Sequence, residues 1–197
     1  MSKKRYFDRY AHRWDELQHE VDPEQLEALV RRFEIQKGDW ILDVGTGTGI
    51  LLPYLVKSVE KEGKVLALDF SAEMLSRARS KIKGGSVSFV RSNAEKMPLK
   101  DRTFDRAICF ACFPHFENKQ RALLEMSRVL KPGGKLFIAH LLSSAQIKEH
   151  HLRAGADVKH DVLPSSPALK RMMIKARFKE IEIVDQHCLY LARGEKR

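Results

Sequence analysis

The chain has 197 residues, of which 43% are hydrophobic and 31% are charged, and its formal net charge is +10 at pH 7. A chain of this size can bury a sizeable core, and the composition is ordinary for a globular protein. We expect no membrane span, because no run approaches the roughly 18 apolar residues that one needs. The basic residues near the start are followed by no apolar region, so we expect no secretory signal. Three cysteines, an odd number, argue against a disulfide framework and favour a cytoplasmic protein.

The positive charge raises the question of a nucleic-acid partner. The excess of Lys and Arg is spread along the chain without a polybasic tail, and it is densest in residues 77–106. Arg77, Arg79, Lys81 and Lys83 fall mostly on the solvated side of one predicted helix. We therefore favour a solvated face over an RNA footprint, and a nucleic-acid partner stays open but is not favoured.

The first elements in chain order are two helices, at residues 6–18 and 23–33, the second with Asp22 as N-cap and Pro23 in its first position. Hydrophobic strands then alternate with helices, which predicts a parallel sheet with right-handed crossovers. The strands are expected at residues 40–44, 64–69, 87–91, 106–110 and 135–141, and the helices between them at 49–59, 72–82 and 119–130. Ser71 and Asn118 are the predicted N-caps of the last two helices, and the Pro-Gly-Gly of residues 132–134 is the stop signal after the second of them.

The alternation stops after Leu141. A polar stretch with several histidines runs to Leu163 and is taken as a solvated loop. The Pro-Ser-Ser-Pro of residues 164–167 starts a further helix that runs to Arg177, and short strands at residues 180–185 and 188–192 finish the chain.

The most informative segment is residues 40–50, where an apolar strand leads into Gly45, Gly47 and Gly49. Glycines at a turn let the backbone approach a ligand closely. The spacing fits poorly with the dinucleotide pattern G-x-G-x-x-G, and the phosphate loop pattern is absent. Asp43 places an acid beside the turn, where it would repel a pyrophosphate but could accept hydrogen bonds from a cationic ligand. Asp69 ends the next strand, where it could bind ribose hydroxyls. This combination suits S-adenosylmethionine, a nucleoside that carries a sulfonium and an amino acid.

With these motifs, the chain resembles the class I S-adenosylmethionine-dependent methyltransferases, and within them the methyltransferase type 11 group that includes the ubiquinone and menaquinone biosynthesis enzymes. The resemblance covers residues 5–141 and is carried, in the right order, by residues 41–49, 65–71, 92–98, 104–110 and 130–136. It implies a Rossmann-like, doubly wound α/β fold with a seven-stranded sheet that is mostly parallel and ends in an antiparallel hairpin. We expect one domain of residues 1–197, with a helical cap (1–37), a cofactor-binding core (38–141) and an acceptor-side insertion with the closing hairpin (142–197).

The resemblance also implies the cofactor-binding residues, which follow the strands because ligands bind at the carboxyl ends of strands in such sheets. They are Asp43, Gly45, Thr46, Gly47, Gly49, Asp69, Phe70, Met74, Asn93, Ala94, Glu95, Phe110, Tyr10 and Trp14. Asp43 would lie near the methionine amino group, or else cap a helix, and Asp69 would accept both ribose hydroxyls. The adenine amino group would be bound by a backbone carbonyl, Asn93 Oδ1 or Glu95, unless Asn93 simply caps a turn. Tyr10 and Trp14 are four residues apart on one predicted helix face, which could close the site or pack on the sheet.

The acceptor side is less well defined by the sequence. His115 and His140 are candidate general bases or acceptor contacts, although structural histidines are the commoner case. His150, His151 and His160 could bind the substrate; with Asp161 they also form a ligand set suited to zinc or iron, but we predict no metal. Cys109 and Cys112 should point to opposite faces of a strand and act as apolar fillers.

The sequence therefore predicts methyl transfer from S-adenosylmethionine to a small-molecule acceptor. One alternative is an RNA or ribosome-associated methyltransferase, motivated by the calculated pI of about 9.6. The other is a non-catalytic nucleoside-binding protein of the same fold. The oligomeric state is not encoded in any motif that we recognise.

Overall fold

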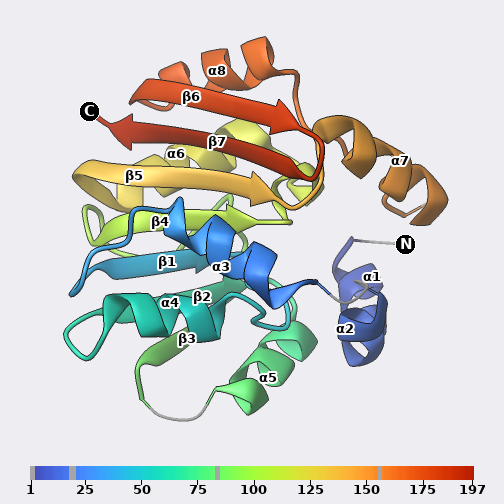
Figure 1. The fold of residues 1–197 in the computed structure, drawn as a ribbon, viewed down its shortest axis with the longest axis horizontal. Helices are drawn as coiled ribbons and strands as arrows, with labels where there is room; N and C mark the ends of the chain where they lie inside the picture. The colour runs from blue at the N-terminus through green and yellow to red at the C-terminus, as the bar shows by residue number, and fades with distance from the viewer. Residues whose placement is uncertain (1–2, 18–20, 83–84, 155–156) are drawn as a thin grey trace.

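The structure is a computed structural model, and it describes residues 3–17, 21–82, 85–154 and 157–197. Its centre is a seven-stranded sheet with the strand order β3-β2-β1-β4-β5-β7-β6 (Figure 1). Neighbours from β3 through β5 are parallel, whereas β7 is antiparallel to β5 and β6. The strands are β1 (Trp40–Val44), β2 (Lys64–Asp69), β3 (Val87–Arg91), β4 (Phe104–Phe110), β5 (Leu130–His140), β6 (Phe178–Gln186) and β7 (Leu189–Lys196). This confirms the predicted doubly wound α/β fold with its antiparallel hairpin.

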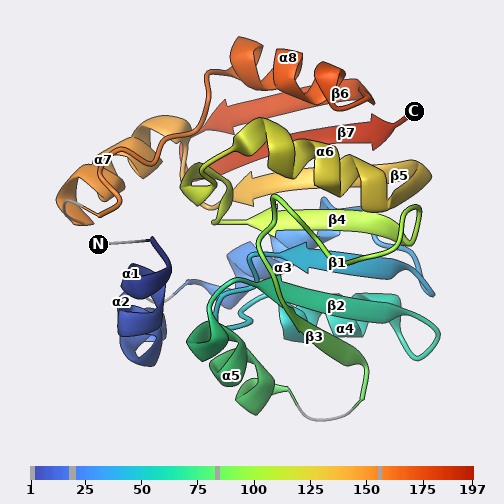
Figure 2. The same ribbon diagram turned by 180° about the vertical axis from the view of Figure 1, so that it is seen from behind.

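Helices cover both faces of the sheet. They are α1 (Lys3–Tyr10), α2 (Trp14–Leu17), α3 (Pro23–Arg31), α4 (Leu52–Val59), α5 (Ala72–Lys81), α6 (Lys119–Val129), α7 (Ser144–Ala154) and α8 (Ser166–Lys175), with short 3-10 turns at Ala11–Arg13 and Phe113–His115. Helices α3 and α4 lie on one face, and α6 and α8 lie on the other (Figures 1 and 2). Ile41 and Leu42 of β1 are fully buried in different apolar clusters, so the central strand is buried on both faces, as parallel strands usually are.

The predicted N-caps are confirmed by hydrogen bonds. Asp22 Oδ1 accepts from the Glu24 amide at 2.9 Å, Ser71 Oγ accepts from Met74 at 3.1 Å, and Asn118 Oδ1 accepts from Arg121 at 2.9 Å. Each side chain satisfies a backbone donor that the first turn of a helix leaves free. Helices α3, α5 and α6 therefore begin at the residues that the local sequence predicts.

Some boundaries differ from the prediction. The first helix is not continuous: α1 and α2 are separated by the 3-10 turn Ala11–Arg13, and the predicted end at Gln18 lies outside the described residues, as does Lys83. Helix α4 begins three residues late because Gly49 has a φ of +82°, which an α-helix does not allow. Strand β5 begins early, because Leu130 already pairs with Phe104 before a bulge restores the register.

The prediction of a solvated loop after Leu141 is wrong, since residues 144–154 form the helix α7. The Ser143 amide donates to Gln146 Oε1 at 2.9 Å, and the Gln146 amide donates to Ser143 Oγ at 3.2 Å. This is a capping box, and the sequence pattern Ser-x-x-Gln could have revealed it.

Two helical segments lie beyond the carboxyl ends of the parallel strands. The pair α1 and α2 and the helix α7 stand at this end of the sheet in both views (Figures 1 and 2). None of the described helices has the length and apolar character that a membrane crossing requires. The end of the sheet that these helices flank is where an open α/β fold normally binds its ligand.

Candidate functional site

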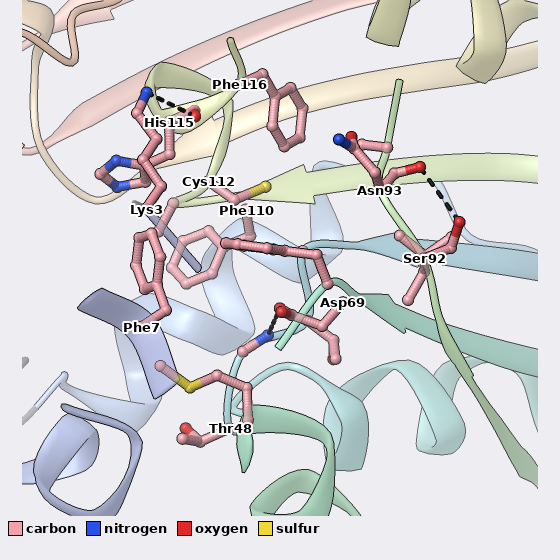
Figure 3. Close-up of a pocket in the computed structure, with 18 of the residues that line it drawn as sticks. Lys3, Phe7, Thr48, Asp69, Ser92, Asn93, Phe110, Cys112, His115 and Phe116 are labelled. Atoms are coloured by element: carbon pink, nitrogen blue, oxygen red, sulfur yellow. Dashed lines mark hydrogen bonds between the residues drawn. The ribbon is translucent and has the colours of Figure 1, made fainter. Parts of the chain in front are cut away.

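A cavity of about 400 Å³ opens at the carboxyl ends of the parallel strands. It is lined by most of the predicted cofactor residues: Trp14, Gly45, Thr46, Gly47, Asp69, Phe70, Met74, Asn93, Ala94, Glu95 and Phe110. His115 lies on one side of the cavity, Ser92 and Asn93 lie on the other, and Asp69 lies between them (Figure 3). The structure thus brings together residues from the ends of β1, β2 and β4, the segment after β3, and the N-terminal helices.

Other predicted residues are not part of this wall. Within the described residues, the lining does not include Asp43, Gly49, Tyr10, His140, His150, His151 or His160. Conversely, the wall contains residues that the sequence analysis did not assign to a binding site: Lys3, Phe7, Thr48, Ile50, Leu68, Ser92, Ala111, Cys112, Phe116 and Glu117. Several of these come from the N-terminal cap and from the loop after β4, whose positions only the tertiary structure defines.

The three glycines of the turn have different physical roles. A Cβ on Gly45 would lie 2.7 Å from the Cβ and Sγ atoms of Cys112, and one on Gly49 would lie 3.0 Å from the Cβ of Ala78. These two glycines are required by protein packing. A Cβ on Gly47 would meet no described atom within 4 Å, although Gly47 lines the cavity. Of the three glycines, only Gly47 therefore leaves open space at the position that a Cβ would take.

Asp69 lies at the end of β2 with both carboxylate oxygens held. Its Oδ2 accepts from the Gly47 amide and its Oδ1 from the Ser71 amide, each at 2.9 Å. Burial raises the pKa of Asp69, while these amides act in the opposite direction. A carboxylate offers about four lone-pair positions. The Phe70 amide also acts on this carboxylate, and the lone pairs that remain let the cavity-lining side chain accept hydrogen bonds from ligand hydroxyl groups.

Asp43 lies beneath the turn. It is 2% exposed and accepts a 2.6 Å hydrogen bond from Thr46 Oγ1. Burial raises the pKa of Asp43 to about 7; the bond from Thr46 opposes this, and the nearby charge of Asp69 adds to it. Asp43 can therefore act on a ligand through its electric field and through Thr46, which does line the cavity.

The side chains of Asn93 and Glu95 are occupied by the protein itself. Asn93 Oδ1 accepts from the Glu95 amide at 2.8 Å, and Glu95 Oε1 accepts from the Asn118 amide at 2.8 Å. The turn-capping alternative for Asn93 is thus what the structure shows. The backbone oxygens of Asn93 and Glu95 also accept bonds, from the Lys96 amide at 3.1 Å and from Arg121 Nε at 3.3 Å. Each of these contacts considered for an adenine amino group therefore already accepts a bond from the protein.

The N-terminal helices α1 and α2, called the cap from here on, lie along one side of the cavity. Phe7 and Trp14 line it with ring centroids 5.3 Å apart, whereas Tyr10 packs on Tyr6 at 4.8 Å. The expectation that Tyr10 and Trp14 share a face assumed one unbroken α-helix. The 3-10 turn Ala11–Arg13 breaks that geometry, and it is Phe7 that accompanies Trp14.

The opposite side carries a histidine cluster. His115 Nδ1 lies 2.8 Å from Asp161 Oδ2, and His151 of α7 is bonded through Nδ1 to the backbone oxygen of Asp161 at 2.5 Å. His140 is buried, and burial with the neighbouring His115 and His151 lowers the pKa of His140 to about 3. His160 is exposed. Of the four predicted acceptor-side residues in this paragraph, only His115 reaches the cavity in the described chain.

The prediction that the side chains of Cys109 and Cys112 point to opposite faces of a strand is wrong. Cys109 and Cys112 have their Sγ atoms 2.9 Å apart, and Cys112 Sγ donates to the Val44 oxygen at 2.9 Å. The strand ends at Phe110, and Ala111 has a φ of +54°, so the alternation of side chains stops before Cys112. Within the described residues no group of three His, Cys, Asp or Glu side chains is placed to hold a metal ion.

Comparison with known proteins identifies the family. A family model described as a methyltransferase domain matches residues 42–138. The ubiquinone/menaquinone biosynthesis C-methyltransferase of Salmonella paratyphi B is 31% identical over an alignment of 185 positions, and the match covers 78% of this chain and 74% of that protein. The chain belongs to the class I S-adenosylmethionine-dependent methyltransferases.

Solved structures of methyltransferases share this fold. An S-adenosylmethionine-dependent methyltransferase from Aquifex aeolicus is 28% identical with a TM-score of 0.68, and the match covers 88% of this chain and 92% of that one. The phosphoethanolamine N-methyltransferase 2 of Haemonchus contortus, in complex with phosphomonomethylethanolamine and S-adenosylhomocysteine, is 16% identical with a TM-score of 0.79 over 98% of this chain and 58% of that one. The second likeness concerns the fold alone.

The cavity of this methyltransferase fits S-adenosylmethionine by its own geometry. The open space at Gly47 adjoins Asp69, whose Oδ2 accepts a hydrogen bond from the Gly47 amide and whose carboxylate keeps lone pairs for a ligand. Apolar side chains, Phe70, Met74 and Ala94, line the same cavity. Hydroxyl acceptors, an open backbone and an apolar surface are what a nucleoside needs.

Proposed function

We propose that this protein transfers a methyl group from S-adenosylmethionine, bound in the cavity at the carboxyl ends of β1 and β2, to a small-molecule acceptor bound on the His115 side. The observation that carries the proposal is the arrangement of Asp69. Its carboxylate is held by the amides of Gly47 and Ser71, and it lines the cavity at the position expected for ribose recognition. A second function is not proposed, because no feature of the site favours RNA over a small acceptor.

The residues have distinct proposed roles. Asp69 accepts the ribose hydroxyls, the backbone at Gly45 and Gly47 contacts the methionine part, and Asp43 with Thr46 stabilises its positive charge. Phe70, Met74 and Ala94 pack against the adenine, whose amino group binds backbone carbonyls near Asn93. Phe110 and Trp14 complete the wall of the cofactor cavity.

Bound S-adenosylmethionine supplies a methyl group on a sulfonium, which is already a reactive donor. The protein's contribution is then mainly to hold the acceptor in line and to exclude water. Phe7 and Trp14 of the cap and Phe116 of the loop after β4 provide an apolar enclosure for this. The relatives named above act on carbon and on nitrogen by their names, so the acceptor atom does not carry over from them.

Size favours a small acceptor. A cavity of about 400 Å³ is close to the lower end of the range for ligand sites, and much of it would be taken by the cofactor. The acceptor must therefore be compact, or it must extend outwards between the cap and α7.

Calorimetry with S-adenosylmethionine and S-adenosylhomocysteine tests the proposal. We expect micromolar affinity for the wild type. Asp69→Ala should weaken binding by about 100-fold or more, because the two hydrogen bonds to this charged group would contribute roughly 1.5–3 kcal/mol each. Asp69→Asn keeps an acceptor and the side-chain shape, and Asp101→Ala, which changes an exposed aspartate, is the matched control. Equal affinity of the wild type and folded Asp69→Ala would refute the role of Asp69, and no binding by the wild type would refute the proposed function.

A further inference from the structure

Three segments that are distant in sequence meet at His115. Its Nδ1 atom lies 2.8 Å from Asp161 Oδ2, in the segment after α7. Lys3 of α1 lies 2.7 Å from the other oxygen, Asp161 Oδ1, and its Nζ also donates to the backbone oxygen of His115 at 2.9 Å. The side chains of His115 and Asp161 are only 12% and 8% exposed. The carboxylate is thus held between an imidazole and an ammonium group, and the loop that carries the imidazole is held by the same ammonium group.

The electrostatics define the protonation state of this pair. Burial lowers the pKa of His115, helped by His151 on α7 and by Lys3, while Asp161 acts in the opposite direction. Burial alone would raise the pKa of Asp161, but the bonds from His115 and Lys3 outweigh it and lower that pKa. His140 on β5 is the further titratable group coupled to His115, and its own lowered pKa leaves it uncharged near neutral pH. Near neutrality the pair is therefore a neutral imidazole beside a carboxylate.

A neutral imidazole beside a carboxylate carries its proton on the nitrogen that faces the carboxylate. Here that nitrogen is Nδ1, so Nε2 has the free lone pair. His115 lines the cavity, and Nε2 makes no hydrogen bond to the rest of the described chain. The Phe7 ring lies edge-on to the imidazole at 5.1 Å and limits its rotation (Figure 3). The free lone pair therefore belongs to a cavity-lining imidazole whose orientation is fixed by Asp161 and Phe7.

We propose that His115 is the general base of the reaction, that Asp161 and Lys3 are its positioning residues, and that the acceptor accordingly presents a protic group, a hydroxyl, thiol or N–H, to His115 Nε2. This inference rests on the proposed function. Nε2 takes the proton of the acceptor while the acceptor's electron pair forms the bond to the methyl carbon, and the carbon–sulfur bond breaks with its electron pair left on sulfur. The products are the methylated acceptor, S-adenosylhomocysteine and a protonated His115, which then loses its proton to water.

The position of Lys3 adds a condition. Lys3 belongs to α1, the same helix whose Phe7 lines the cavity. The base is complete only when this helix lies over the site, so the closure that excludes water also orients the imidazole. A merely structural role for the pair, as a clasp for the segment after α7, would require the same Nδ1–H tautomer but would leave kcat and its pH profile unchanged when Asp161 is replaced.

The tautomer of His115 is the first test, because it needs no acceptor. Nitrogen-15 spectra of histidine-labelled protein with saturating S-adenosylhomocysteine should show His115 as the neutral Nδ1–H tautomer at pH 7.5, with the signal assigned by its loss in His115→Gln. In Asp161→Ala the proton should shift towards Nε2, whereas His187→Asn, an exposed histidine, should change nothing at His115. An imidazolium, an Nε2–H tautomer in the wild type, or an unchanged tautomer in Asp161→Ala would overturn the proposal.

The second test compares acceptor chemistry. The probes are matched pairs: a phenol and its methyl ether, a thiol and its thioether, and a secondary and a tertiary amine. Turnover should be confined to the protic member of each pair, and equal turnover of the aprotic members would overturn the proposal. If none of these probes is methylated, the tautomer test still applies, because an imidazolium or an Nε2–H tautomer in the wild type overturns the proposal.

The variants separate positioning from binding. For a methylated probe, His115→Gln should lower kcat by about 10² to 10⁴-fold. Asp161→Ala should lower kcat by about 10 to 100-fold and displace the limb of the pH profile that reports the base, with the affinity for S-adenosylhomocysteine unchanged. Glu149→Gln, an exposed carboxylate on α7, is the control, and an Asp161→Ala effect no larger than this control would count against the role of Asp161. Failure of the proposed function itself would appear differently, as absent cofactor binding in the wild type.

Discussion

Thr48 Oγ1 donates a 2.5 Å hydrogen bond to Asp15 Oδ1, which joins α2 to the glycine turn. The other oxygen of Asp15 pairs with Lys81 of α5 at 2.6 Å. Burial alone would raise the pKa of Asp15, but the bonds to Lys81 and Thr48 lower it overall, so the carboxylate stays charged. Since Thr48 and Trp14 line the cavity, this carboxylate fastens the cap directly beside the proposed cofactor site.

Removal of that carboxylate should loosen the cap. We expect Asp15→Ala to speed the dissociation of S-adenosylhomocysteine by about 5 to 10-fold, the equivalent of one ordinary hydrogen bond. Stopped-flow fluorescence of Trp14 in a Trp40→Phe background would measure this rate. Glu16→Ala is the matched control, because Glu16 is exposed and pairs with the exposed Arg13. The same rate in both variants would show that the contact does not hold the cap.

Two glycines of the turn should respond differently to alanine. At Gly45 the new Cβ would clash with Cys112 at 2.7 Å, and the φ of +70° adds backbone strain. We expect Gly45→Ala to lower the free energy of unfolding by more than about 2 kcal/mol. At Gly47, where no described atom lies within 4 Å, the cost should be about 1 kcal/mol from the φ of +56°. Gly47→Ala should instead weaken cofactor binding by 10-fold or more. Urea unfolding and calorimetry would check both, and equal stability losses would contradict the assignment.

The raised pKa of Asp43 predicts a pH dependence of stability. An acid whose pKa rises from 3.8 to about 7 on folding holds its proton more tightly in the native state. Its effect on stability therefore becomes less favourable as the pH rises from about 4 to about 7. Asp43→Asn cannot ionise, so its stability relative to the wild type should increase between pH 5 and pH 8, by at most about 3 kcal/mol. Urea unfolding at several pH values tests this with Asp101→Asn as control, and a difference that stays constant with pH would refute it.

The capping box of α7 should control local order. Gln146 Oε1 accepts from the Ser143 amide at 2.9 Å and from the Cys188 amide at 3.0 Å. We expect Gln146→Ala to destabilise α7 by roughly 1 kcal/mol, since caps typically contribute that much. Hydrogen exchange should become faster in α7 but not in α6. The prediction fails if the two helices respond alike, or if Glu149→Gln has the same effect.

Some of the residues that line the cavity could be predicted from the sequence. Asp69, Gly47 and the segment around Asn93 follow strands whose ends meet at one edge of the sheet, and they do line one cavity. Lys3 and Phe7 gave no such signal, because their place depends on how the N-terminal helices fold back over the sheet. The Cys109–Cys112 contact was missed because Ala111 adopts a left-handed conformation that the strand pattern does not reveal.

The sequence by itself determined the elements whose causes are local. The bounds of β1, β2 and β3 and the caps at Asp22, Ser71 and Asn118 depend on residues within a few positions of one another, where periodicity and capping act. Only the tertiary structure decided that His115 would meet Asp161 and Lys3, which lie 46 and 112 residues away. Such pairs form because separate crossovers return distant segments to the same end of the sheet, and no local pattern encodes that meeting.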